Sequence, residues 1–106
     1  MAKELQLTLG QKLRLMYVEN KHGEIDGAKA RIGWVKFSKT GRTVYYRGLE
    51  LTKGQGISGN FIHSATGHEY WVSGVKKRGS NTHWAEHVSV EIDADAFEAY
   101  SKLRSG

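Results

Sequence analysis

The chain contains no cysteine and no long hydrophobic run. Without cysteine it cannot form a disulfide, a thiolate zinc site or a cysteine nucleophile. No apolar stretch approaches the roughly 18 residues that a membrane-spanning helix needs, and the chain opens without a signal peptide. The sequence also lacks a Walker A lysine motif and the G-x-S-x-G motif of a serine nucleophile. These absences favour a cytoplasmic protein with no membrane contact and no common catalytic signature.

The length and composition are those of one globular domain, covering residues 1–106. Hydrophobic residues make up 39% of the chain and charged residues 25%, which is unlike the composition of a disordered tail. A chain of 106 residues is long enough to bury one modest core.

The formal net charge of +5 is distributed unevenly along the chain. Residues 1–27 are neutral overall, residues 28–78 carry a net +8, and residues 79–106 carry −3. A basic middle and an acidic end predict a face that attracts anions, although many small domains are basic for solubility alone.

Alternating hydrophobic residues predict that most of the chain forms strands. Leu5, Leu7 and Leu9 alternate with polar residues, and Leu13, Leu15 and Tyr17 continue with the same parity until the break at residues 20–23. Residues 31–37 are rich in valine, isoleucine and aromatic side chains, which suit a half-buried strand.

Two S-x-T-G tetrapeptides, Ser38–Gly41 and Ser64–Gly67, each separate two aromatic strands. A three-residue hairpin loop needs positive φ at its last position, where glycine has no Cβ to clash. We therefore predict two hairpins, 31–47 and 60–73, in which Ser38 pairs with Arg42 and Ser64 with His68.

That register assigns side chains of the second hairpin to opposite faces, because faces alternate along a strand. One face would carry Phe61, His63, Glu69 and Trp71, and the other Ile62, Tyr70 and Val72. The second set is the more apolar, so we predict that it faces the core and that Trp71 faces outward. A slip of one residue would reverse this assignment.

The remaining segments complete a small barrel. The glycine-rich residues 52–59 predict a mobile loop, and Val88–Ile92 a further strand. Asp95 and Glu98 have the spacing of a capping box, which predicts a short helix at about residues 94–104. The predicted fold class is all-β: a small SH3-like barrel of five or six antiparallel strands with a short C-terminal helix.

Three patterns suggest catalysis or a cofactor, and each has a simpler interpretation. A His63–Glu69 pair would suit acid–base chemistry, but cross-strand pairs of this kind are more often sheet contacts. His83 and His87 have the i,i+4 spacing of zinc ligands but follow a glycine-rich turn, where a helix is not expected. GQGISG at residues 54–59 matches G-x-G-x-x-G but leads into a strand instead of a helix. We expect no metal, no cofactor and no enzyme activity.

Basic and aromatic residues in the middle of the chain suggest a binding surface. Cations that bind phosphates beside rings that stack on bases are typical of proteins that bind single-stranded nucleic acid. The candidate binding residues are Lys39, Arg42, Trp71, Lys76, Lys77, Arg78 and Trp84. We expect a non-catalytic binding module for nucleic acid or another anionic partner. The alternatives are a protein-binding inhibitor or immunity-type protein with an acidic partner, and a small hydrolase or metal enzyme using the histidines.

The run from Arg31 to Ile92 resembles a family of small bacterial proteins. The resemblance rests on RIGWVKFSKTGRTVYYRG (31–48), GISGNF (56–61), TGHEYWVSGVKKRG (66–79), HWAEH (83–87) and VEID (90–93), which cover over half the chain. It implies an SH3-type barrel and a bacterial source, and it supplies no catalytic residue. Members often carry the name 1-deoxy-D-xylulose-5-phosphate synthase, but that activity needs large domains and a diphosphate–metal motif, which this chain lacks.

Overall fold

A closed barrel of six antiparallel strands forms the body of the protein. The computed structural model describes residues 11–54, 59–77, 79–84 and 89–105. The strands are β1 (Lys12–Glu19), β2 (Ala30–Phe37), β3 (Thr43–Tyr46), β4 (Leu49–Lys53), β5 (Phe61–His63) and β6 (Glu69–Gly74). Each strand pairs with the next along the chain, and β6 returns to pair with β1. This closure confirms the predicted small β-barrel and leaves no open edge among these six strands.

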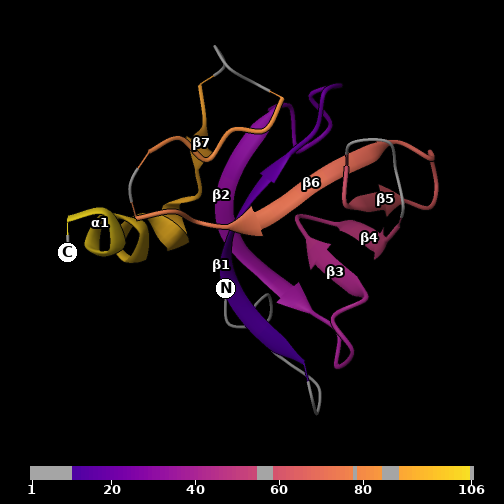
Figure 1. Cartoon of the computed structure of the whole chain (residues 1–106), viewed down its shortest axis with the longest axis horizontal. Coiled ribbons are helices and arrows are strands. Elements are labelled where there is room, and N and C mark those ends of the chain that lie inside the picture. The colour runs from indigo at the N-terminus through magenta and orange to yellow at the C-terminus, as the bar shows by residue number, and fades with distance from the viewer. Residues whose placement is uncertain (1–10, 55–58, 78, 85–88, 106) are drawn as a thin grey trace.

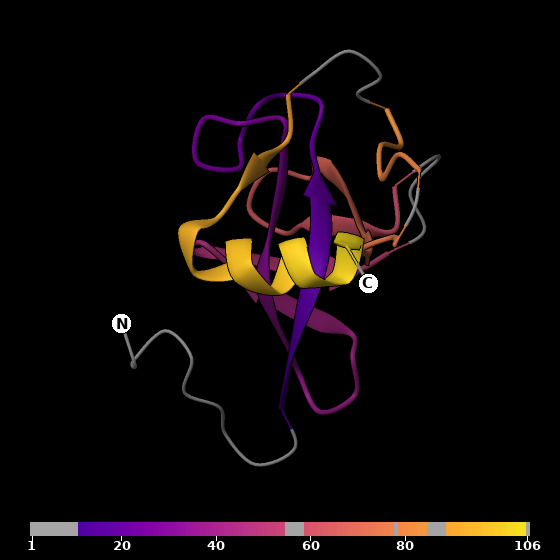
Figure 2. The same ribbon diagram turned by 90° about the vertical axis from the view of Figure 1, so that its left-hand side faces the viewer.

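The C-terminal segment packs against the outside of the barrel. Strand β7 (Glu91–Ile92) pairs in parallel with β2, and a 3-10 turn (Ala94–Ala96) leads into helix α1 (Phe97–Ser105). In Figure 1 the helix lies to one side of the barrel, far from β3, β4 and β5, and in Figure 2 it crosses in front of β1 and β2. The predicted helix is confirmed, and the predicted strand at its entrance is shorter than expected.

The predicted capping box is wrong. The helical segment begins after Asp93, whose side chain makes no capping hydrogen bond. Asp95 lies inside the 3-10 turn, where its backbone carbonyl accepts a hydrogen bond from Trp34 Nε1 at 3.0 Å. The turn is held by tertiary contacts, which local spacing cannot reveal.

Strand β1 buries both of its faces, so the protein has two hydrophobic clusters. The barrel interior contains Val18, Val35, Val44, Leu51 and Tyr70 among its buried side chains. The second cluster lies between the barrel wall and the C-terminal segment, and it consists of Tyr17, Ala30 and Ile32 with partly buried neighbours that include Trp71, Ile92 and Tyr100. The parity of Leu13, Leu15 and Tyr17 therefore marks the outer face of β1, which the C-terminal segment covers.

Both S-x-T-G glycines adopt positive φ as predicted, 76° at Gly41 and 76° at Gly67. The pairing is wrong by one residue in both hairpins. Ser38 donates its backbone N–H to the carbonyl of Thr43, and His63 donates its own to His68. Each turn therefore holds four residues instead of three.

This one-residue shift in pairing changes which side chains of β5 face the core, but not which side chains of β6 do. Phe61 pairs with Tyr70 and Ile62 with Glu69. Tyr70 and Val72 lie in the core as predicted, and Trp71 faces out of the barrel. Phe61 is buried and Ile62 only partly so, which reverses their predicted positions. The predicted His63–Glu69 pair is therefore absent.

Two tight turns at one end of the barrel carry non-glycine residues at positive φ. Asp26 has φ 53° and precedes Gly27, and Arg47 has φ 48° and precedes Gly48. Positive φ at both central positions defines the type I′ turn, the tightest hairpin connection. The two side chains meet, with Arg47 Nη2 at 2.6 Å from Asp26 Oδ2.

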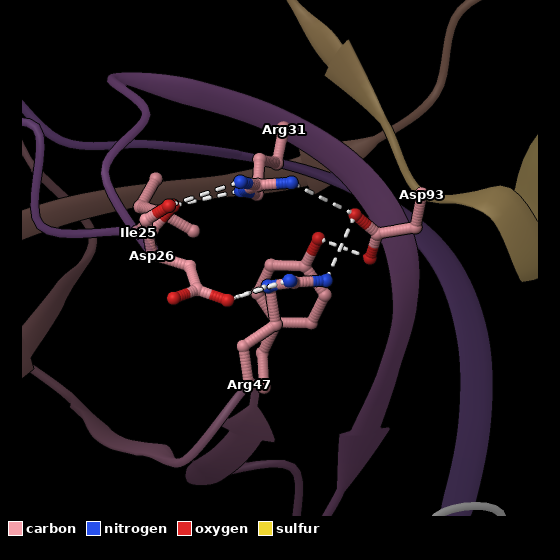
Figure 3. A network of polar contacts seen from close by, with 6 residues as sticks. Ile25, Asp26, Arg31, Arg47 and Asp93 are labelled. Carbon is pink, nitrogen blue, oxygen red and sulfur yellow. Dashed lines mark hydrogen bonds and ion pairs between the residues drawn. The ribbon is translucent and has the colours of Figure 1, made fainter. Parts of the chain in front are cut away.

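These turns belong to a polar network that holds the C-terminal segment (Figure 3). The carboxylate of Asp93 is largely buried and accepts a hydrogen bond from Tyr46 Oη at 2.6 Å. The guanidinium groups of Arg31 and Arg47 lie 3.3 and 3.2 Å from its other oxygen. The network joins β2, β3 and the residue that precedes the helical segment.

Several predictions fall on residues outside those that the structure describes. They are the strand containing Leu5, Leu7 and Leu9, the centre of the glycine-rich loop, and the roles of Arg78, His87 and Val88. The ends of the glycine-rich segment do lie between antiparallel β4 and β5, so GQGISG is not part of a βαβ unit. In the part of the chain that is described, no helix has the length and hydrophobicity needed to cross a membrane.

Candidate functional site

A hollow of about 270 Å³ opens at the end of the barrel where β1 finishes and β6 begins. Three separate segments line it: the β1–β2 connection, the β5–β6 turn and the loop after residue 79. The residues that line this hollow are Lys21, His22, Gly67, His68, Glu69 and Trp84. A cation, two imidazoles, a carboxylate and an indole thus share one concave surface.

Asn20 shapes the first wall of the hollow. Its buried side-chain oxygen accepts backbone N–H bonds from His22 at 2.8 Å and Glu24 at 3.2 Å, which fixes a tight turn directly after β1. Its side-chain nitrogen donates to the carbonyl of Glu69 at 3.2 Å. One asparagine therefore sets the position of the β1–β2 connection relative to β6.

Two histidines from different segments lie in contact in the hollow. The rings of His22 and His68 stack with their centroids 4.2 Å apart. His68 Nδ1 lies 2.8 Å from Glu24 Oε1, and this hydrogen bond lowers the pKa of the Glu24 carboxyl below its usual value. Tyr70 Oη lies 3.5 Å from the same oxygen. Burial, with the nearby Glu24 charge, raises the pKa of Tyr70 to about 12.

Trp84 forms the wall of the hollow that comes from the loop after residue 79, and a buried carboxylate holds it there. The side chain of Glu19 is fully buried. It accepts the backbone N–H of His83 at 2.8 Å and that of Trp84 at 2.5 Å. Tyr17 Oη donates to it at 2.5 Å, and burial together with this contact raises the pKa of Tyr17 above its ordinary value. The loop is thereby fastened to β1, and Lys21 Nζ lies 4.9 Å from the centre of the Trp84 ring.

Trp71 lies behind this wall. Its ring stacks on His83 with centroids 3.9 Å apart and an angle of 8° between the planes. The His83 ring in turn meets Trp84 edge-on at 5.0 Å. His83 is exposed and Trp71 is only partly so, which makes Trp71 the support of a continuous row of rings.

Lys39 and Arg42 lie at the opposite end of the barrel. Their turn follows Phe37, which pairs with Lys12 at the start of β1, whereas Trp71 pairs with Glu19 at its end. At a rise of about 3.3 Å per residue, the length of β1 separates the two ends by roughly 20 Å. Figures 1 and 2 both place the β1–β2 connection at the top of the molecule and the β2–β3 turn near the bottom. The predicted binding residues therefore do not form one surface.

Lys76 and Lys77 are exposed on the loop that follows β6. Arg104 from α1 donates to the carbonyls of Lys76 at 3.0 Å and Gly79 at 2.9 Å, and Asn81 Oδ1 accepts the N–H of Lys76 at 2.7 Å. The loop is thus held on both sides. It connects β6 to the segment that carries Trp84, while Arg78 lies outside the described residues.

Among the described residues, the two catalytic candidates His63 and Glu69 do not come together, and His87 lies outside those residues. His63 pairs with His68 across the sheet, and its Nδ1 lies 3.3 Å from Thr66 Oγ1. Glu69 Oε1 instead accepts the N–H of Gly59 at 2.7 Å. Among the described residues no cluster of three or more histidine, aspartate or glutamate side chains is placed to hold a metal ion.

Sequence reasoning missed Glu19, Lys21, His22, Glu24 and His68. Glu19 did carry a signal, since it continues the parity of Leu13, Leu15 and Tyr17 and so places a carboxylate where an apolar side chain is expected. The Glu24–His68 pair spans 44 residues and no local pattern indicates it.

Comparison of the chain with protein-family models, curated proteins and solved structures found no match in any of the three.

Proposed function

We propose that the protein is a non-catalytic cytoplasmic module that binds single-stranded nucleic acid at the hollow. The observation that carries this proposal is the convergence of Trp84, Lys21 and two histidines on one concave surface. Single-stranded nucleic acid offers bases that stack on rings and phosphates that bind cations, and proteins that bind it combine both contacts.

Each wall of the hollow has a role in this proposal. A base stacks against the row formed by Trp84 and His83, which Trp71 supports from behind. Lys21 binds a neighbouring phosphate. The strand then continues along the loop of Lys76 and Lys77, where Arg104 and Asn81 hold the backbone in place. Arg78 follows directly in sequence and adds to the positive charge of this run.

Lys39 and Arg42 make no contact with the strand in this proposal. They lie roughly 20 Å from the hollow along β1, more than twice the screening length of about 8 Å at physiological salt. This separation makes the double substitution of Lys39 and Arg42 a matched control for charge.

Oligonucleotide titrations at several salt concentrations test the proposal. Replacing Lys76 and Lys77 by serine should reduce the dependence of log affinity on log salt by about 0.7 for each phosphate that the protein no longer binds. Trp84→Ala should weaken binding by about 1–3 kcal/mol with little change in that dependence, because stacking is nearly independent of salt. Lys39→Ser with Arg42→Ser should leave both quantities close to those of the wild type.

Absence of oligonucleotide binding even at low salt would contradict the proposal. It would favour the competing role of a protein-binding inhibitor or immunity-type protein, in which the same cations cover an acidic partner. Co-purification from native lysate with and without nuclease treatment separates the two roles, since only a nucleic-acid partner is lost on nuclease treatment.

We also propose that the chain belongs to the family of small bacterial SH3-type barrel proteins that its sequence resembles. The closed barrel with a C-terminal helix is consistent with that proposal. The binding roles proposed for Lys21, Lys76, Lys77 and Trp84 rest on the geometry of the hollow and its loop, and not on that family.

A further inference from the structure

The hollow brings the rings of two histidines into stacking contact. Histidine is the side chain that ordinarily gains its proton between about pH 5 and pH 8. The rings of His22 and His68 are 4.2 Å apart, and Lys21 lines the same hollow. Like charges so close together repel unless an anion lies between or beside them.

Each segment around the two rings contributes a titratable group. Lys21 and Glu24 come from the β1–β2 connection, and Glu69 and Tyr70 come from β6. His83 comes from the loop after residue 79 and lies beside Trp84. Glu24 pairs with His68 on the side of Tyr70, and the T-shaped contact of His63 with Tyr70 places His63 beyond that ring. Glu69 already accepts a hydrogen bond from Gly59. The groups that line the hollow and can bind an anion are therefore Lys21, His22 and His68.

Resting on the proposed function, we propose that the hollow is a proton-linked phosphate site. One phosphodiester of the bound strand lies against Lys21 and the protonated rings of His22 and His68. The hollow of about 270 Å³ leaves room beside that phosphate for part of a base against Trp84. Binding the strand therefore takes up protons from solution.

The direction of the pH effect follows from linkage. A bound phosphate stabilises the charged form of the two imidazoles and not the neutral form, so binding is coupled to proton uptake. Affinity therefore rises as pH falls, by up to about tenfold per pH unit for each proton taken up, and this gain disappears at high pH. Glu24 supports the charge on His68, and the lowered pKa of Glu24 keeps it ionised over this range.

The test uses the full chain with two probes, a short thymidine oligonucleotide and sulfate, which keeps its charge across this pH range. Oligonucleotide affinity at fixed ionic strength should increase about tenfold or more between about pH 8 and pH 6. Calorimetry in buffers with different heats of ionisation should detect proton uptake. His22→Gln should remove the contribution of one of the two imidazoles to both effects, and because His22 is exposed the variant should fold normally. His63→Gln, outside the hollow, should retain them.

The outcomes separate this inference from the proposed function. An oligonucleotide that binds equally at both pH values without proton uptake overturns the proton-linked site and leaves nucleic-acid binding intact. If only sulfate binds and shifts the NMR signals of the His22 and His68 rings, nucleic-acid binding is wrong and the anion site stands. If neither probe binds, both proposals are overturned.

Discussion

At the scale of single residues, Glu19 is the buried charge on which the Trp84 wall depends. Among the described residues, its carboxylate accepts hydrogen bonds from two consecutive backbone N–H groups and one tyrosine hydroxyl. Such a carboxylate is stable in the interior because its oxygens accept hydrogen bonds. Hydrogen bonds to an ionised acceptor are stronger than those between neutral groups.

Glu19→Gln should therefore destabilise the protein and loosen the loop that carries Trp84. A glutamine side chain has the same size but places an N–H₂ group against donors, which costs about 1–3 kcal/mol. Urea denaturation measures the loss, and the tryptophan emission of the folded variant should shift as Trp84 moves. Glu50→Gln, an exposed position on β4, should change stability by less than about 0.5 kcal/mol. Equal stability of the two variants would contradict this role for Glu19.

Gly33 is required because the Asp93 network approaches its backbone. A Cβ at this position would lie 2.2 Å from Asp93 Oδ2 and 2.6 Å from Tyr46 Oη. Gly33→Ala should thus cost about 1–3 kcal/mol or more, as overpacked cores do. Gly74→Ala is the matched control, since nothing lies within 4 Å of a Cβ there. Thermal unfolding of both variants gives the comparison, and a stable Gly33→Ala would show that the network can move aside.

At the scale of elements, the sequence predicted local backbone conformation better than it predicted which residues pair across a hairpin. In each S-x-T-G turn the glycine takes positive φ and the threonine Oγ1 accepts the N–H two residues later, in Arg42 and in His68. Those are local features that the tetrapeptide determines. The tetrapeptides nevertheless sit differently in their hairpins, because Ser38 is a paired residue while Ser64 belongs to its turn.

The same difference between local conformation and long-range pairing explains which parts of the site the sequence could predict. Alternation correctly placed Tyr70 and Val72 inside and Trp71 outside, because these positions lie on one continuous strand. The reversal of Phe61 and Ile62 came from pairing across the turn, which is a property of two strands together. Contacts such as His22 with His68 depend on closure of the whole barrel, and no sequence pattern reports them.

The β5–β6 turn provides a test of this local rule. At Gly67 φ is 76° and no atom lies within 4 Å of an added Cβ, so Gly67→Ala adds backbone strain without a clash. The expected loss of stability is about 1–2 kcal/mol. Gly67→Asn should lose less, because asparagine adopts the left-handed conformation more readily. Chemical denaturation distinguishes the three proteins, and an unchanged Gly67→Ala would contradict the strain argument.

At the scale of the whole molecule, three buried tyrosines limit stability at high pH. Burial raises the pKa of Tyr17, Tyr46 and Tyr70, to about 12 for Tyr70. In the unfolded chain they ionise near pH 10. Since the folded pKa values are higher, their contribution is complete below about pH 10 and is lost as pH rises toward the folded values.

The free energy of unfolding should thus fall steeply above about pH 10. Phenolate absorbance should rise together with the loss of β-sheet circular dichroism, because these tyrosines ionise as the barrel opens. Tyr70→Phe should make the fall less steep. Complete tyrosine ionisation in a protein that is still folded would contradict the buried hydroxyl contacts with Glu19, Asp93 and Glu24.

Binding of single-stranded nucleic acid at one end of the barrel can be followed through the three tryptophans of the chain. Trp84 lines the hollow, Trp71 lies behind it, and Trp34 donates its indole N–H to Asp95 beside the C-terminal helix. Their indole N–H signals can be followed by NMR while a short oligonucleotide is added to the labelled wild-type protein. The signal of Trp84 should move most, that of Trp71 less, and that of Trp34 should stay in place. Three unmoved signals at saturating oligonucleotide, or a shift of Trp34 alone, would contradict binding at the hollow.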